Sequence, residues 1–279
     1  MNWQIISGFF CSFVPYYAGF GRETLFFPAF FLVNLCYMVE KYDGIVLRTI
    51  KYSDSLMIAD IYTRQAGRRS FLLPVTRSKN SKVRNVLFQP LSMVAFAASG
   101  RSTKSLARIA DAQPLKLYAT LPYDVVKSSI AMFLAEVLTY SLRDEGADET
   151  IYSFIENALL WLDAADEAYA DFHLVFLSRL LLFLGIYPNI GEAQEGSYFD
   201  MLSGCCVREH PLHAHFLMPN ATARFAQLLN CDFQTVRRLG LNKELRGSFL
   251  TAFEEYYRLH IPDFPFLRST AVLRELFMV

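Results

Sequence analysis

The sequence lacks the short motifs by which common nucleotide-dependent and hydrolytic enzymes are identified. Its 279 residues contain no Gly-Lys dipeptide, which excludes the phosphate-binding loop of nucleotide hydrolases. They also contain no G-x-G-x-x-G loop, no G-x-S-x-G elbow and no H-E-x-x-H helix. No close pair of carboxylates forms a convincing catalytic dyad. The sequence therefore gives no reason to expect nucleotide hydrolysis.

Cysteine is scarce, and charged residues make up only 19% of the chain. The cysteines are five in number and irregularly spaced, which does not suit a disulfide framework and favours a reducing, cytoplasmic compartment. With 53% hydrophobic residues the chain can bury a sizeable core, which excludes disorder over most of its length.

Charge is almost absent from residues 1–37, which contain only Arg22 and Glu23 but 12 aromatic residues. A secretory signal requires a positively charged start, but Met1 to Gly21 contains no Lys or Arg. The apolar run Thr24–Tyr37, of 14 residues, is too short to span a bilayer as a helix. We expect this segment to be a hydrophobic extension outside the native protein, which would start at Met38. A membrane anchor is the alternative.

The formal net charge is zero, but the two signs are unevenly distributed. Residues 38–120 carry 14 Lys and Arg against 5 Asp and Glu, whereas residues 121–279 carry 12 against 21. A basic front followed by an acidic back favours a polyanion-binding module beside an interaction or scaffold module.

The basic front consists of short strand-like runs without a helical period. Pro90 makes one of these runs an edge or bulged strand. Five such strands predict a small closed barrel, for which the oligonucleotide-binding (OB) fold is the commonest solution. The strands are expected over Gly44–Ile50, Ser55–Thr63, Arg68–Val75, Asn85–Ala97 and Thr103–Ala112, followed by a linker over Pro114–Pro122.

The positive charges of this front concentrate in the predicted turns. A nucleic-acid backbone is a line of phosphates that Lys and Arg neutralise with release of counterions. We expect a sheet face carrying Tyr62, Phe71 and Phe88 to stack unpaired bases beside these turns. The alternative is a set of solvated loops that happen to be basic. The predicted DNA-binding residues are Arg64, Arg68, Arg69, Arg77, Lys79, Lys82, Arg84, Arg101 and Lys104.

After Tyr123 the apolar residues recur at spacings of three and four, which predicts a bundle of helices. Apolar stripes run over residues 130–142, 151–162 and 174–184. Later helices are expected over Ala221–Asn230, Asp232–Leu239, Lys243–His260 and Phe266–Phe277. The predicted fold is therefore α+β: an OB-fold barrel over residues 38–118 and an all-α domain over 119–279.

One cluster contains residue types that bind metal: Cys205, Cys206, His210, His213 and His215. Structural zinc sites usually space their thiols as C-x-x-C, and adjacent thiols rarely converge on one tetrahedral centre. We predict an irregular loop between helices, with no metal and no cofactor. A thiol- or zinc-dependent enzyme is the alternative.

Several segments resemble RecO, the family of bacterial recombination mediators. They begin with Tyr42–Thr49, Tyr52–Leu56 and Ile61–Arg68, and a basic turn at Arg77-Ser78-Lys79 follows at the matching place. Phe176–Leu181 with Leu184–Asn189 is similar to the central helix and exit of that family, and His260 with Leu267–Leu273 to its C-terminal helix. The resemblance covers about residues 39–277.

The resemblance implies a non-enzymatic DNA repair protein of the cytoplasm and nucleoid. Such a protein binds single- and double-stranded DNA and anneals complementary strands. With RecR it loads RecA onto strands coated by single-strand-binding protein. Many members carry a four-cysteine zinc module after the position of Pro188, but Asn189–Ser203 contains no cysteine here. This variant is therefore expected to have lost that module.

The helical domain of this family also docks the acidic, apolar-ended tail of the single-strand-binding protein. Arg143 and Arg179 are candidate rim residues for a groove that holds this tail. Two other readings stay open: an RNA-binding OB-fold protein, and an interaction protein anchored to a membrane by residues 1–37.

Overall fold

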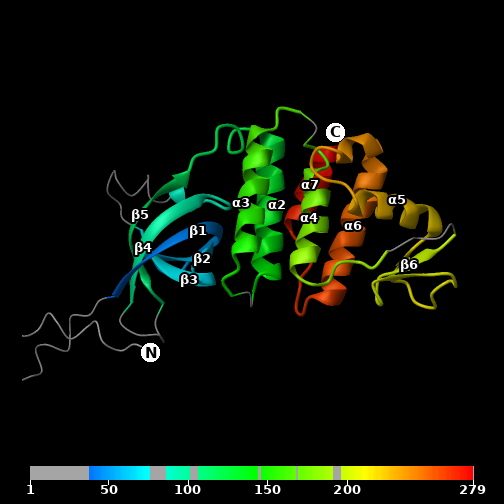
Figure 1. Ribbon diagram of the computed structural model, residues 1–279. Coiled ribbons are helices and arrows are strands. Elements are labelled where there is room, and N and C mark those ends of the chain that lie inside the picture. The colour runs from blue at the N-terminus through cyan, green and yellow to red at the C-terminus, as the bar shows by residue number, and fades with distance from the viewer. Residues whose placement is uncertain are drawn as a thin grey trace, which may run out of the picture. The chain divides into compact units, whose positions relative to one another are not determined.

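The computed structural model describes residues 38–75, 86–100, 106–143, 146–167, 169–190 and 196–278, all of them within one compact unit, Tyr37–Val279. Five strands form its first part, a closed barrel with the order β1-β2-β3-β5-β4 (Figure 1). All neighbouring pairs are antiparallel except β3 and β5, which are parallel and meet at Leu72 and Arg108. The predicted five-stranded OB-fold barrel is thus confirmed. The strands are β1 (Met38–Lys51), β2 (Leu56–Thr63), β3 (Gly67–Pro74), β4 (Met93–Gly100) and β5 (Arg108–Lys116).

Alternation along the strands separates a barrel interior from an outer face. On β2, Ala59 and Ile61 belong to the barrel core, whereas Asp60 and Tyr62 lie on the opposite face. The backbone of β1 lies so close to β2 at Gly44 that a Cβ atom there would collide with the side chain of Ile61. Only glycine permits this approach.

Two predicted strands differ from the structure in extent. Val86–Leu87 are helical, Pro90 lies in a turn, and Leu91 has a φ of 61°, so the fourth strand begins only at Met93. The fifth strand begins at Arg108 and continues through Pro114 to Lys116, so the linker starts later than predicted. Proline is tolerated at this place because β5 is paired there with β4 alone.

The second part of the unit is helical, as predicted. Side-chain caps define several helix starts: Asp124 accepts the Lys127 N–H, Asp148 those of Thr150 and Ile151, and Asn242 that of Leu245. The segment expected as a helix over 232–239 is only a short 3-10 helix, η2 (Val236–Leu239). The α-helices are α2 (Val125–Ser141), α3 (Glu149–Ala164), α4 (Phe172–Phe183), α5 (Pro219–Leu229), α6 (Lys243–His260) and α7 (Ser269–Met278).

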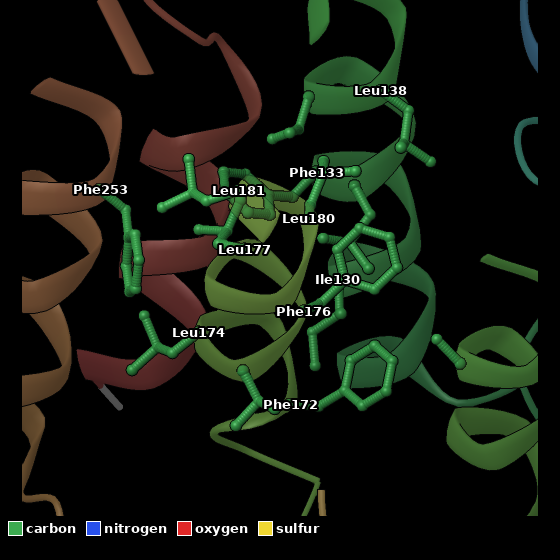
Figure 2. Close-up of a cluster of buried hydrophobic side chains, with 14 of the residues drawn as sticks. Ile130, Phe133, Leu138, Phe172, Leu174, Phe176, Leu177, Leu180, Leu181 and Phe253 are labelled. Carbon is green, nitrogen blue, oxygen red and sulfur yellow. The ribbon is translucent and has the colours of Figure 1, made fainter. Parts of the chain in front are cut away.

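Helix α4 lies at the centre of the helical core. Figure 2 shows Phe172, Leu177 and Leu181 among the side chains that α4 directs toward its neighbours. These side chains meet Ile130 and Phe133 of α2 and Phe253 of α6 in one buried cluster. In the described part of the chain, no helix combines the length and apolarity that crossing a membrane requires.

A small sheet interrupts the helices. Its strands are β6 (Tyr198–Asp200), β7 (Cys205–Val207) and β8 (Phe216–Leu217), in the order β7-β6-β8. The prediction of an irregular loop over the cysteine–histidine cluster is wrong for Cys205 and Cys206, which lie in β7, whereas His210, His213 and His215 lie in the irregular connection between β7 and β8. Strands of two and three residues are too short for alternation to reveal them in a sequence.

Candidate nucleic-acid interface

The nine basic residues predicted to bind DNA fall into two groups. Arg64, Arg68 and Arg69 lie at or beside the β2–β3 turn. That turn is at the opposite end of the hairpin from Val75, after which the chain leaves the described residues. The other six predicted residues lie outside the described part: Arg77, Lys79, Lys82, Arg84, Arg101 and Lys104.

Arg64 connects the barrel to helix α3. Its guanidinium pairs with Glu149 and with Glu156 (Nη2–Oε2, 2.9 Å) and lies 4.2 Å from the ring centre of Tyr152. Lys116 of β5 pairs with the same Glu156 carboxylate at 3.2 Å. The structure therefore gives Arg64 a set of contacts within the protein.

Arg68 belongs to a second polar network on the outer face, centred on the buried carboxylate of Asp60. Asp60 accepts Arg48 Nε at 2.7 Å and Arg68 Nη2 at 3.3 Å, while Arg68 Nη1 donates to the Thr139 carbonyl of α2 at 2.6 Å. Burial alone would raise the pKa of Asp60. The hydrogen bond from Ser70 and the two arginines outweigh burial and hold that pKa below its ordinary value.

Arg69 has a different environment from its two neighbours. Its side chain is exposed, and Nη1 donates to the Tyr42 hydroxyl at 3.3 Å. The Tyr42 hydroxyl in turn donates to Glu40. Burial, followed by this contact with Glu40, raises the pKa of Tyr42. Arg69 is thus the predicted DNA-binding residue of the described chain whose charge is most accessible to solvent.

The three aromatic rings that we expected to stack bases are core residues. Tyr62, Phe71 and Phe88 are at most 2% exposed. Tyr62 stacks on Tyr152 of α3 with a centroid distance of 6.3 Å, and Phe71 packs edge-to-face on Phe96 inside the barrel. The expectation is wrong because all three rings pack against other apolar groups rather than against solvent, Tyr62 and Phe71 through strand alternation and Phe88 from the turn region before β4.

The outer face of β1, β2 and β3 has one covered end and one open end. At the covered end, Ile45, Leu47 and Tyr62 join the core of the helical part. Toward the other end the face becomes exposed, with Ile50 at 44% and Tyr52 at 66%. Tyr52 was assigned no role from the sequence, although an aromatic residue in a predicted turn is a signal for an exposed ring.

The connection between barrel and helices is held by one carboxylate. Asp163, near the end of α3, accepts the N–H groups of Ala119, Thr120 and Leu121 at 2.7–2.8 Å. Lys127 is buried and donates to the Asp163 carbonyl at 2.9 Å. Burial would raise the pKa of Asp163, but the backbone hydrogen bonds outweigh it and lower that pKa.

The two arginines predicted at a partner groove lie apart from each other. Arg179 of α4 is partly buried and donates to the Cys231 carbonyl at 2.8 Å. Arg143 lines a cavity of about 330 Å³ together with Leu184, Ile186 and His260, and its guanidinium lies 3.8 Å from the Asp263 carboxylate.

Another cavity, of about 290 Å³, opens beside the first turns of α6. Arg246 is held there by Asp171 (Nε–Oδ1, 2.6 Å), and Arg274 donates to Thr251 at 2.7 Å. The completely buried His173 also lines it, and burial, aided by Arg246, lowers its pKa to about 3. The lining is His173, Lys243, Glu244, Arg246, Gly247, Ser248, Leu250, Thr251 and Arg274. The sequence alone does not reveal this cavity, because α7 contributes one of its charges from a distant position.

The cysteine–histidine cluster is dispersed over the small sheet. His213 Nε2 lies 3.2 Å from Asp200, and His215 Nδ1 lies 2.5 Å from Glu255 of α6. His210 packs between Tyr198 and Phe216. Within the described ranges, no three His, Cys, Asp or Glu side chains come together in a way that could hold a metal ion.

Two family models match this chain and together follow its two structural parts. The model described as "Recombination protein O N terminal" matches residues 38–118, and "Recombination protein O C terminal" matches residues 122–269. The first match covers the barrel, and the second extends from just before α2 to the first residue of α7.

Curated proteins resemble the chain over nearly their whole length. The DNA repair protein RecO of Phocaeicola vulgatus is 47% identical over 240 residues, which is 86% of this chain and 100% of the relative. The protein of the same name from Bacteroides fragilis is 43% identical over 241 residues, again 86% and 100%. That of Porphyromonas gingivalis is 32% identical over 238 residues, 84% of this chain and 97% of the relative.

Proposed function

The chain belongs to the RecO family of DNA repair proteins, and from this we propose that it is a recombination mediator that binds DNA through its barrel. The observation that carries the proposal is the coincidence of a closed OB-fold barrel with the region of excess positive charge. We further propose that it anneals complementary strands without nucleotide hydrolysis and works with RecR to load RecA, within the cytoplasm and nucleoid.

We assign the phosphate contacts of this proposal to Arg69, whose side chain is exposed, and to the basic residues of two predicted turns outside the described residues: Arg77, Lys79, Lys82, Arg84, Arg101 and Lys104. Arg64 and Arg68 are weaker candidates, because their guanidinium groups already pair within the protein. Replacing either of them would also disturb the contact between the barrel and the helices. A loss of DNA binding in such a variant would therefore not identify a phosphate contact.

For the tail of the single-strand-binding protein we propose the basic cavity beside α6. Lys243, Arg246 and Arg274 lie around it, Arg246 being paired with Asp171 and Arg274 lying 3.8 Å from Glu254, and Leu250 supplies an apolar wall. An acidic peptide that ends in apolar residues suits this combination better than the surroundings of Arg179, whose guanidinium donates to a carbonyl. Arg143 at the second cavity remains the alternative rim residue.

Annealing of complementary DNA strands tests the function, using the full chain and residues 38–279 in parallel. Strands coated with the cognate single-strand-binding protein are compared with naked strands over a range of salt, without ATP. We expect fast, salt-sensitive annealing of both. Arg77→Ala and Lys79→Ala should each flatten the plot of log K against log[salt] by about one unit. Lys243→Glu should slow only the coated strands.

The outcomes separate the alternatives. No annealing and no DNA binding at low salt would contradict the mediator function. Tighter binding of RNA than of DNA would favour the RNA-binding alternative. Unchanged salt slopes in both alanine variants would remove those two residues from the interface while leaving the function in place.

A further inference from the structure

We propose that the open end of the β1–β3 outer face is a platform for unpaired DNA bases, with the ring of Tyr52 as its stacking residue. The inference rests on the proposed function and deepens it, because it assigns the platform to unpaired strands rather than to duplexes. The platform consists of Tyr52, Ile50, Ile58 and Leu72, with Arg48 and Arg108 at its margins.

Tyr52 is presented by a hydrogen-bonded turn. The N–H groups of Tyr52 and Ser53 both donate to the Leu56 carbonyl, at 3.1 and 2.9 Å, and the Val75 N–H donates to the Ser55 carbonyl at 2.9 Å. The side chain is nevertheless 66% exposed, and within the described residues its ring packs against no other ring. Because the backbone of the turn is already fixed, only the two side-chain torsions of Tyr52 lose freedom when a base stacks on its ring. The entropic cost of stacking is therefore small.

An apolar row continues the surface away from Tyr52. Ile50, Ile58 and Leu72 are direct neighbours across β1, β2 and β3, so they share one face of the sheet. That face is the outer one, because Ala59 and Phe71 on the same strands belong to the barrel core. Ile50 is 44% exposed, and Ile58 and Leu72 are partly exposed. A second flat ring can therefore lie against this row.

The charges around the platform suit a polyanion. Arg108 faces Leu72 at the end of the row, and Arg48 occupies the next row. The carboxylate of Asp60 is shared by two arginines, and that of Asp54 pairs with Lys51 at 2.9 Å. Both of these carboxylates are therefore paired with basic side chains. A net positive charge remains beside the platform, and phosphates can contact it.

Stacking on a protein ring requires a base that is not already stacked inside a duplex. Paired bases are stacked on each other and present only their edges and the phosphates. Tyr52 should consequently contribute to the binding of single strands and contribute nothing to the binding of duplexes.

The test compares Tyr52→Ala and Tyr52→Phe with the wild type in binding an oligo-dT strand and a duplex of equal length. Tyr123→Ala is the matched control, because Tyr123 is 83% exposed but lies at the start of the helical part. We expect Tyr52→Ala to weaken single-strand binding about 5- to 150-fold, as loss of one stacked base does. Tyr52→Phe and Tyr123→Ala should bind as the wild type, and no variant should alter duplex binding or the salt slope.

Three results would overturn the platform: single-strand affinity unchanged in Tyr52→Ala, an equal loss for the duplex, or an equal loss in Tyr123→Ala. Tyr52 is exposed, so its removal should leave the fold intact, and unchanged unfolding in urea checks this. If the wild type binds no DNA at all, the proposed function fails. If it binds and Tyr52→Ala binds equally well, the platform alone fails.

Discussion

His173 at the start of α4 shows how a single buried side chain makes stability depend on pH. Its imidazole is completely buried, and its pKa of about 3 is far below the ordinary value of 6.5. Between these two values the unfolded chain binds a proton that the folded chain does not, so stability falls as the pH falls. Well above pH 6.5 the ring is neutral in both states and contributes no pH dependence.

We expect the wild type to lose about 1.4 kcal/mol more than His173→Gln when the pH is lowered from 7.5 to 5.5. Urea unfolding at the two pH values measures this loss. His210→Gln is the matched control, because His210 is exposed on the small sheet and should retain the pH dependence of the wild type. Equal losses in the wild type and in His173→Gln would show that His173 does not govern the effect.

Among the elements, length decided what the sequence could predict. Helix α6 matches its predicted extent, Lys243–His260, because a long apolar stripe and the Asn242 cap define it. The strands β6 to β8 were missed because two or three residues carry no periodicity.

The residues of the candidate site could also be predicted only in part. Charge located the barrel as the basic module, but only the fold shows that Arg64 and Arg68 face helices, that Tyr62 is buried and that Tyr52 is exposed.

The linker between barrel and α2 depends on Asp163, and Asp163→Asn tests this dependence. An amide can offer only one oxygen to the three N–H groups that the carboxylate now accepts, and its NH₂ group would face donors. We expect a loss of about 3 kcal/mol in the free energy of unfolding in urea. Asp148→Asn is the control, since Asn caps a helix about as well as Asp and should leave the stability nearly unchanged. Similar stability of the two variants would show that the carboxylate of Asp163 does not hold the linker in place.

In the compact unit as a whole, barrel and helices share one core. Ile45, Leu47, Tyr62, Leu91 and Met93 of the barrel part belong to the same buried cluster as the helical side chains. The ion pairs of Arg64 and the bond from Arg68 to α2 surround this contact. Separating the two parts would expose apolar surface and remove the contacts of Glu156 with Arg64 and Lys116 and of the Thr139 carbonyl with Arg68, so neither part should open independently of the other.

Leu180→Ala tests this coupling at a distance. Leu180 is fully buried in α4, and its truncation should lower the free energy of unfolding by about 2–5 kcal/mol. If the unit opens cooperatively, native-state hydrogen exchange should show the same loss of protection for the Ala59 amide in β2 as for core amides of α4. Leu182→Ala on the same helix is the control, because Leu182 is 45% exposed and its removal should leave both regions protected. Full protection of β2 in Leu180→Ala would mean that the barrel is stable without the helices, and the shared core would then not couple them.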